Sequence, residues 1–194
     1  TNVTNSSTQM AIGMGSLGTL QFNDQLGNAT NAIDDVLPFA YEEPWDGTTG
    51  TSEFNIFGSQ LNNGSITYKA PALELMGATI SATVDYDPQA NVDAPSPGAV
   101  GADGASGEGY TIAIAHESGL TIGGGATKVA NTDARDGESG GTGYIKFANG
   151  PLTVAYQEFY HNAASLAADS DGSGYAVAYS AGDMSFSYSV QNEQ

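Results

Sequence analysis

Large apolar residues and small polar residues alternate along many stretches of this chain, which is the pattern of β-strands with two different faces. In residues 184–191, serines separate Met184, Phe186, Tyr188 and Val190. The same period of two recurs at 80–86, 110–115, 152–157 and 175–179, and less strictly at 9–14, 18–23 and 65–70. The pattern predicts an all-β chain of about ten strands.

Short and long connections alternate between the predicted strands. Tight turns are predicted at 118–119, 149–151 and 181–183, where glycine supplies the positive φ of a hairpin. Polar loops are expected at 87–108, 131–141 and 162–173. This rhythm is typical of an antiparallel up-and-down transmembrane β-barrel. A soluble sandwich gives a similar alternation, but the scarcity of charge on both strand faces favours lipid outside and water inside.

Residues 24–64 form the longest stretch without a strand pattern. They contain seven acidic residues, no basic residue and several large apolar ones, including Leu37, Trp45 and Phe57. Loops of this length are usually functional or disordered, and the apolar content predicts that this one packs. We therefore predict that the loop folds inward, with its carboxylates toward a water-filled lumen and a short helical turn within 28–36.

Composition narrows the functions that the chain can have. Its 194 residues include 22 acidic and 4 basic side chains and no cysteine, for a net charge of −18. This charge leaves no basic surface for nucleic acid, and the lack of cysteine excludes thiol chemistry. His116 and His161 lie at predicted strand ends without a nucleophile motif, so we expect no enzymatic activity.

Two segments resemble a known family. The stretch Gly15–Asn23 (GSLGTLQFN), followed by a segment rich in Gly, Asn, Ala and Asp up to Asp35, is similar to the general diffusion porins of Gram-negative bacteria, in particular their alphaproteobacterial branch. In that family a Gly-rich strand leads into a long loop that narrows the pore. Gly64–Pro71 (GSITYKAP) resembles the strand after that loop. Elsewhere only the hairpin rhythm matches.

The resemblance implies a homotrimer in the bacterial outer membrane, in contact with membrane lipid and lipopolysaccharide. It also implies a barrel of roughly sixteen strands, so the chain is expected to be a fragment that lacks strands at both ends. Residues 1–194 then form one partial barrel domain, with 24–64 as its constriction loop. Four apolar residues of the first two strands are candidates for the trimer interface: Met10, Ile12, Leu20 and Phe22.

The candidate site residues are mostly acidic. The predicted pore constriction consists of Asp34, Asp35, Glu42, Glu43, Asp46 and Glu53, because acids that line a lumen concentrate cations and repel anions. The predicted lumen wall includes Lys69, Asp85, Lys146 and Gln157. A solvated acidic surface loop is one alternative. Calcium bound by Asp34 and Asp35 is another, since Ca²⁺ takes oxygen ligands from flexible loops; no cofactor is otherwise required.

We therefore expect a porin, a water-filled channel for passive diffusion of ions and small hydrophilic solutes, with a preference for cations. The alternative is a secreted β-rich adhesin or surface-layer module that binds calcium. A porin needs detergent and runs as a heat-modifiable trimer, whereas an adhesin is soluble in buffer.

Overall fold

The computed structural model describes residues 8–24, 30–33, 36–40, 61, 64–90, 105–130, 137–162 and 169–193. These residues form one antiparallel sheet of 11 strands and two short 3-10 helices. The predicted all-β class is confirmed. No helix in the described ranges has the length and apolar character that a membrane crossing requires.

The strands follow one another across the sheet in chain order. The first five are β1 (Thr8–Gly13), β2 (Thr19–Asp24), β3 (Ile66–Lys69), β4 (Leu73–Leu75) and β5 (Ala78–Ala90). The others are β6 (Ala105–His116), β7 (Leu120–Val129), β8 (Glu138–Asn149), β9 (Leu152–Asn162), β10 (Ser170–Ala181) and β11 (Met184–Glu193). The helices are η1 (Gly15–Leu17) and η2 (Asn31–Ile33). Neighbouring strands in the sheet follow the order β1-β2-β3-β5-β6-β7-β8-β9-β10-β11, so β3 pairs directly with β5. The short strand β4 also pairs with β5 but lies outside this order.

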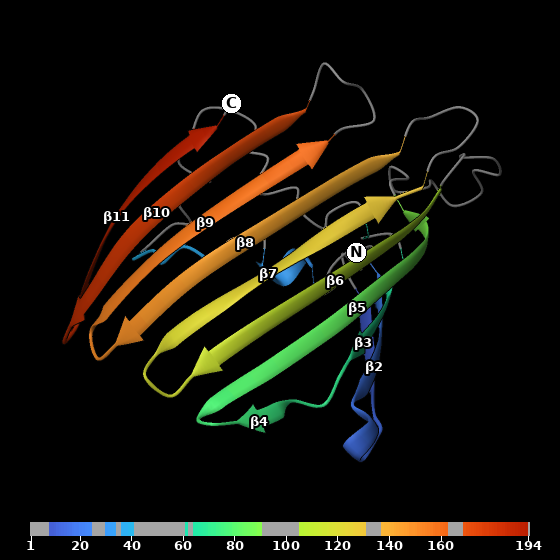
Figure 1. The fold of residues 1–194 in the computed structure, drawn as a ribbon, viewed down its shortest axis with the longest axis horizontal. Coiled ribbons are helices and arrows are strands. Elements are labelled where there is room, and N and C mark those ends of the chain that lie inside the picture. Colours follow the sequence, from blue (N-terminus) through green and yellow to red (C-terminus); the bar gives the residue numbers. More distant parts are fainter. Residues whose placement is uncertain are drawn as a thin grey trace, which may run out of the picture.

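The predicted up-and-down order is confirmed, and the closed barrel is not observed. β1 and β11 each pair on one side only within the described strands, so the sheet has two edges there. Figure 1 shows β5–β11 side by side in a broad curved sheet, with β2 and β3 turning away at the other end. An open edge presents unpaired backbone N–H and C=O groups, which a complete barrel would pair.

The short turns lie where the glycines predicted them. Gly119, Gly150 and Gly182 have φ of 91°, 56° and 60° in the turns β6–β7, β8–β9 and β10–β11. The 3-10 helix η1 joins β1 to β2, and the helical turn expected within 28–36 is η2. The three-residue strand β4 brings the count to 11 instead of about ten.

Several strands extend further than the sequence pattern indicated. Asp87, Glu108, Glu138 and Asp171 belong to strands, although the predicted loops included all four. The end of an apolar run is therefore not the end of a strand here, because backbone pairing continues where polar side chains begin. The strand wall carries more charge than predicted as a result.

The sheet has two faces of opposite character. One face carries residues such as Thr67, Asp85, Thr142 and Gln157, which are all buried; we call it the covered face. The other, the exposed face, carries large apolar residues that remain exposed on almost every strand: Met10, Ile12, Ile66, Tyr68, Val84, Tyr86, Tyr110, Ile112, Ile114, Ile122, Ile145, Val154, Tyr156, Tyr160, Tyr175, Val177, Tyr179, Phe186 and Tyr188.

The turn before β5 contains a backbone conformation that suits its residue poorly. Met76 has a φ of 51°, next to Gly77 at 78°, and its side chain is 91% exposed. Because asparagine tolerates left-handed backbone better than methionine, Met76→Asn should raise the free energy of unfolding by about 0.5–1 kcal/mol. Urea titration measures this, with Met14→Asn as the control at an ordinary φ of −107°. An equal gain from both substitutions would contradict the explanation.

Candidate functional site

A segment between β2 and β3 crosses the covered face from β5 to β11. Its described residues are 30–33 and 36–40, and we call them the strap. Thr30 bonds to β5, Val36 to β9 and Ala40 to β11, in the order of the strands. In Figure 1 the strap residues appear in blue behind β7–β10. The strap therefore runs across the strands on this one face.

The first attachment of the strap is Asp85 on β5, a side chain with no exposed surface. The backbone N–H of Thr30 donates to Asp85 Oδ2 at 3.0 Å, and the Thr67 hydroxyl donates to Oδ1. Asn23 continues this network, because its Nδ2 donates to Thr67 Oγ1 at 2.9 Å and to Ser65 Oγ at 3.3 Å. A buried carboxylate needs such donors to offset its desolvation.

The second attachment is Gln157 on β9, which is also fully buried. Its Oε1 accepts the backbone N–H of Val36 at 3.1 Å, and its Nε2 donates to the carbonyl of Ile33 at 3.0 Å. Nε2 also donates to Thr142 Oγ1 at 2.9 Å. Both hydrogens of the Gln157 amide are thus used. If the amide were flipped, its NH₂ group would face the N–H of Val36, donor against donor. This side chain holds the strap at two points, three residues apart.

Apolar contacts accompany both attachments. Leu37 is 2% exposed and packs with Ala155, Phe159 and Ala176 of β9 and β10. Leu61, which is fully buried, packs with Ala90 and Val129. The apolar content of residues 24–64 predicted such packing, and these two leucines confirm it for the described part of that stretch.

Glycine makes room for these contacts on the covered face. A Cβ at Gly109 would lie 2.7 Å from Thr30 Cγ2 and 2.9 Å from Leu61 Cδ1, and one at Gly125 would lie 3.0 Å from Ile33 Cδ1. Any larger residue at these positions would push the strap away from the strands. Sequence reasoning missed this role, since a glycine within a strand pattern does not say what approaches it.

The predicted constriction acids lie outside the described residues: Asp34, Asp35, Glu42, Glu43, Asp46 and Glu53. The suggested calcium ligands, Asp34 and Asp35, are among them. Asp34 and Asp35 separate Ile33 from Val36 in the sequence, and those two neighbours are the residues that Gln157 binds.

The predicted wall residues Lys69, Asp85, Lys146 and Gln157 all take register positions on the covered face. Lys69 is opposite Thr83, two positions along β3 from Thr67, and Lys146 is opposite the buried Ala155. Asp85 and Gln157 hold the strap as described above. The covered face of the described strands therefore carries two lysines together with buried acidic and amide groups.

The two histidines make local contacts. His161 Nε2 lies 2.7 Å from Glu138 Oε1, linking β9 to β8 near the ends that lead into the long connections. His116 Nδ1 lies 2.9 Å from Ser118 Oγ and 3.1 Å from the backbone N of Ser118 in the β6–β7 turn. Among the described residues, no three His, Asp or Glu side chains gather as metal ligands would.

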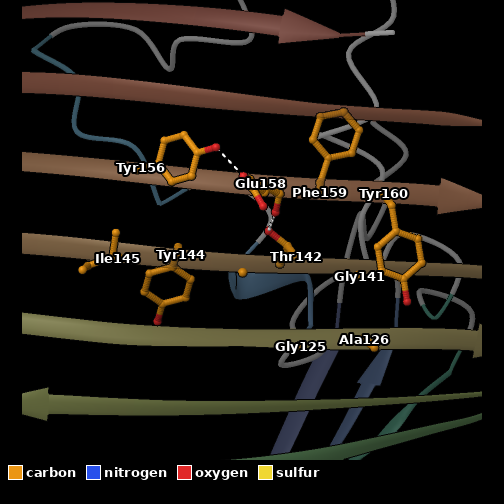
Figure 2. A pocket seen from close by; sticks show the side chains of 11 residues that line it. Gly125, Ala126, Gly141, Thr142, Tyr144, Ile145, Tyr156, Glu158, Phe159 and Tyr160 are labelled. Atoms are coloured by element: carbon orange, nitrogen blue, oxygen red, sulfur yellow. Dashed lines mark hydrogen bonds between the residues drawn. The ribbon is translucent and has the colours of Figure 1, made fainter.

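The exposed face has a hollow of about 560 Å³ over β7–β9. Glycine and alanine form its floor, and Ile145, Tyr156 and Tyr160 rise beside it (Figure 2). The Tyr156 hydroxyl donates to Glu158 Oε1, also at the hollow. This recess in the apolar exposed face thus has a carboxylate in it.

No protein-family model matches this chain, and no curated protein sequence matches it significantly.

Proposed function

We propose that this chain is part of an outer-membrane porin, a channel through which ions and small hydrophilic solutes diffuse passively. The observation that carries the proposal is the exposed face, where large apolar side chains cover almost every strand. Soluble monomers rarely expose a continuous apolar surface of this extent. In a transmembrane barrel apolar lipid-facing residues alternate with lumen-facing ones, and exposed apolar side chains alternate with covered ones on these strands.

The proposal also explains the opposite face. A lumen is polar and filled with water, and the covered face carries Thr67, Asp85, Lys146 and Gln157. The strap that crosses this face narrows the passage and limits solute size. Because diffusion needs neither a cofactor nor an energy source, no catalytic group is required.

Closure of the barrel and the assembly of copies belong to the same proposal. The edges at β1 and β11 must pair with further strands, because unpaired backbone groups are too costly in lipid. We place the protein in the bacterial outer membrane as a homotrimer. Met10 and Ile12 on β1, 55% and 46% exposed, are available for contact with a neighbouring copy.

Planar-bilayer recording of the full-length protein tests this function. We expect stable, ohmic single-channel currents and, under a salt gradient, a reversal potential that shows cation preference, because acids in a narrow passage repel anions. An absence of currents would refute the channel, whereas anion preference would refute only the role assigned to the acids.

The charge selectivity is predicted to depend on the two acids between Ile33 and Val36. The double substitution Asp34→Asn and Asp35→Asn should shift the reversal potential toward zero, because it removes two negative charges while keeping similar side-chain shapes. Asp183→Asn, in the β10–β11 turn, is the control and should leave the potential unchanged. An unchanged potential in the double variant would place the selectivity elsewhere.

The adhesin alternative is distinguished by solubility. A porin should require detergent and migrate as a heat-modifiable trimer, whereas an adhesin should remain in buffer after the membrane is removed. No feature of the described residues favours the adhesin, and its exposed apolar face would promote aggregation in water.

A further inference from the structure

The hollow on the exposed face exists because small residues meet there from neighbouring strands. Ala126 of β7 and Gly141 and Gly143 of β8 line it, and Gly124 of β7 pairs with Gly143. A Cβ at Gly143 would have no atom within 4 Å, whereas one at Gly141 would meet the ring of Tyr160. The space above Gly143 is therefore open, and Tyr160 covers the neighbouring glycine.

Glu158 is the charged residue that lines this hollow. It lies between Gly143 on β8 and Ser173 on β10 in the register, so neither neighbour fills the space beside it. Its carboxylate accepts a hydrogen bond from the Tyr156 hydroxyl (Figure 2). A carboxylate has about four acceptor positions, so it retains capacity for a further donor.

A carboxylate on a lipid-facing surface needs a partner, because its charge is costly in an apolar medium. The lining of the hollow contains no Lys or Arg. Among the described strands, Lys128 is the basic residue of the exposed face, since Lys69 and Lys146 lie on the covered face. A second copy of the chain therefore has little positive charge to bring to Glu158.

We propose that this hollow binds a phospholipid with an ammonium headgroup, whose acyl chain lies over Gly143 and whose ammonium pairs with Glu158. The proposal rests on the proposed function, which places the exposed face in the membrane. Ile145 and the tyrosine rings supply apolar walls for the chain, and the hydroxyls of Tyr156 and Tyr160 supply polar groups near the headgroup. A purely anionic lipid is disfavoured because Glu158 repels it.

Two substitutions separate the two parts of this site. Gly143→Leu fills the hollow without backbone strain, since the φ of Gly143 lies outside the left-handed region. Gly13→Leu controls for the added leucine, because Gly13 also has open space and an ordinary φ but lies at the end of β1 on the covered face. Glu158→Gln removes the charge and keeps the shape.

The test is native mass spectrometry of the full-length protein, purified in detergent and mixed with equal amounts of phosphatidylethanolamine and phosphatidylglycerol. The unsubstituted protein and Gly13→Leu should retain phosphatidylethanolamine in excess. Gly143→Leu should lose the bound lipid, and Glu158→Gln should retain both lipids about equally. Conductance of Gly143→Leu and of Glu158→Gln, recorded in parallel, should be unchanged, because the hollow is outside the passage.

Three outcomes would overturn the lipid site. They are equal retention of the two lipids by the unsubstituted protein, full retention by Gly143→Leu, and loss of the oligomer in Gly143→Leu, which would assign the hollow to a second copy. If the unsubstituted protein conducts ions, each of these outcomes leaves the proposed function intact. An unsubstituted protein without conductance contradicts the proposed function, whichever lipid it retains.

Discussion

Replacing Gln157 with methionine should release the strap from β9 while leaving the sheet folded. The substitution keeps the length of the side chain but removes its hydrogen bonds to Ile33, Val36 and Thr142. Leaving buried backbone groups without partners costs about 1–3 kcal/mol. Hydrogen exchange at the Val36 amide should therefore accelerate by about ten- to a hundredfold.

The matched control is Gln9→Met, because the Gln9 amide donates to Asn23 Oδ1 within the sheet at 3.1 Å. It should leave exchange at Val36 unchanged. In bilayers, Gln157→Met should also shift the reversal potential toward zero and increase current noise, since the strap is no longer fixed. Unchanged exchange in Gln157→Met would show that the Leu37 cluster alone holds the strap.

Placing a lysine on the exposed face should have a large effect on folding into lipid. Val177 of β10 lies between Val154 and Tyr188 in the register, and all three side chains are exposed. If this face contacts lipid, Val177→Lys should reduce the free energy of folding into vesicles by about 2–4 kcal/mol near the bilayer midplane. Urea-dependent folding in the presence of lipid vesicles measures the loss.

The adjacent residue provides the control for this experiment. Ala178 lies on the covered face, between Thr153 and Ser187, so Ala178→Lys should place its charge toward water and cost much less. Equal losses from both lysines, or none from Val177→Lys, would mean that the exposed face does not contact lipid. The pair of variants therefore tests the orientation of the sheet directly.

The strand order was predictable because it depends on local signals. Alternation with a period of two fixes which residues share a face, and the glycines at 119, 150 and 182 mark the short hairpins. These signals lie within a few residues of one another. The strand ends were less predictable, since Asp87 and Glu138 continue strands by pairing with a neighbour rather than by their own pattern.

The sequence by itself therefore determined the all-β class, the hairpin order and the two faces, because each follows from neighbouring residues and backbone geometry. Only the tertiary structure decided that Asp85 and Gln157 hold the strap. Their partners are backbone atoms 55, 121 and 124 residues away, and a backbone N–H or carbonyl leaves no mark in a sequence. The hollow beside Glu158 likewise depends on register, because only strand pairing brings Gly143 opposite that carboxylate.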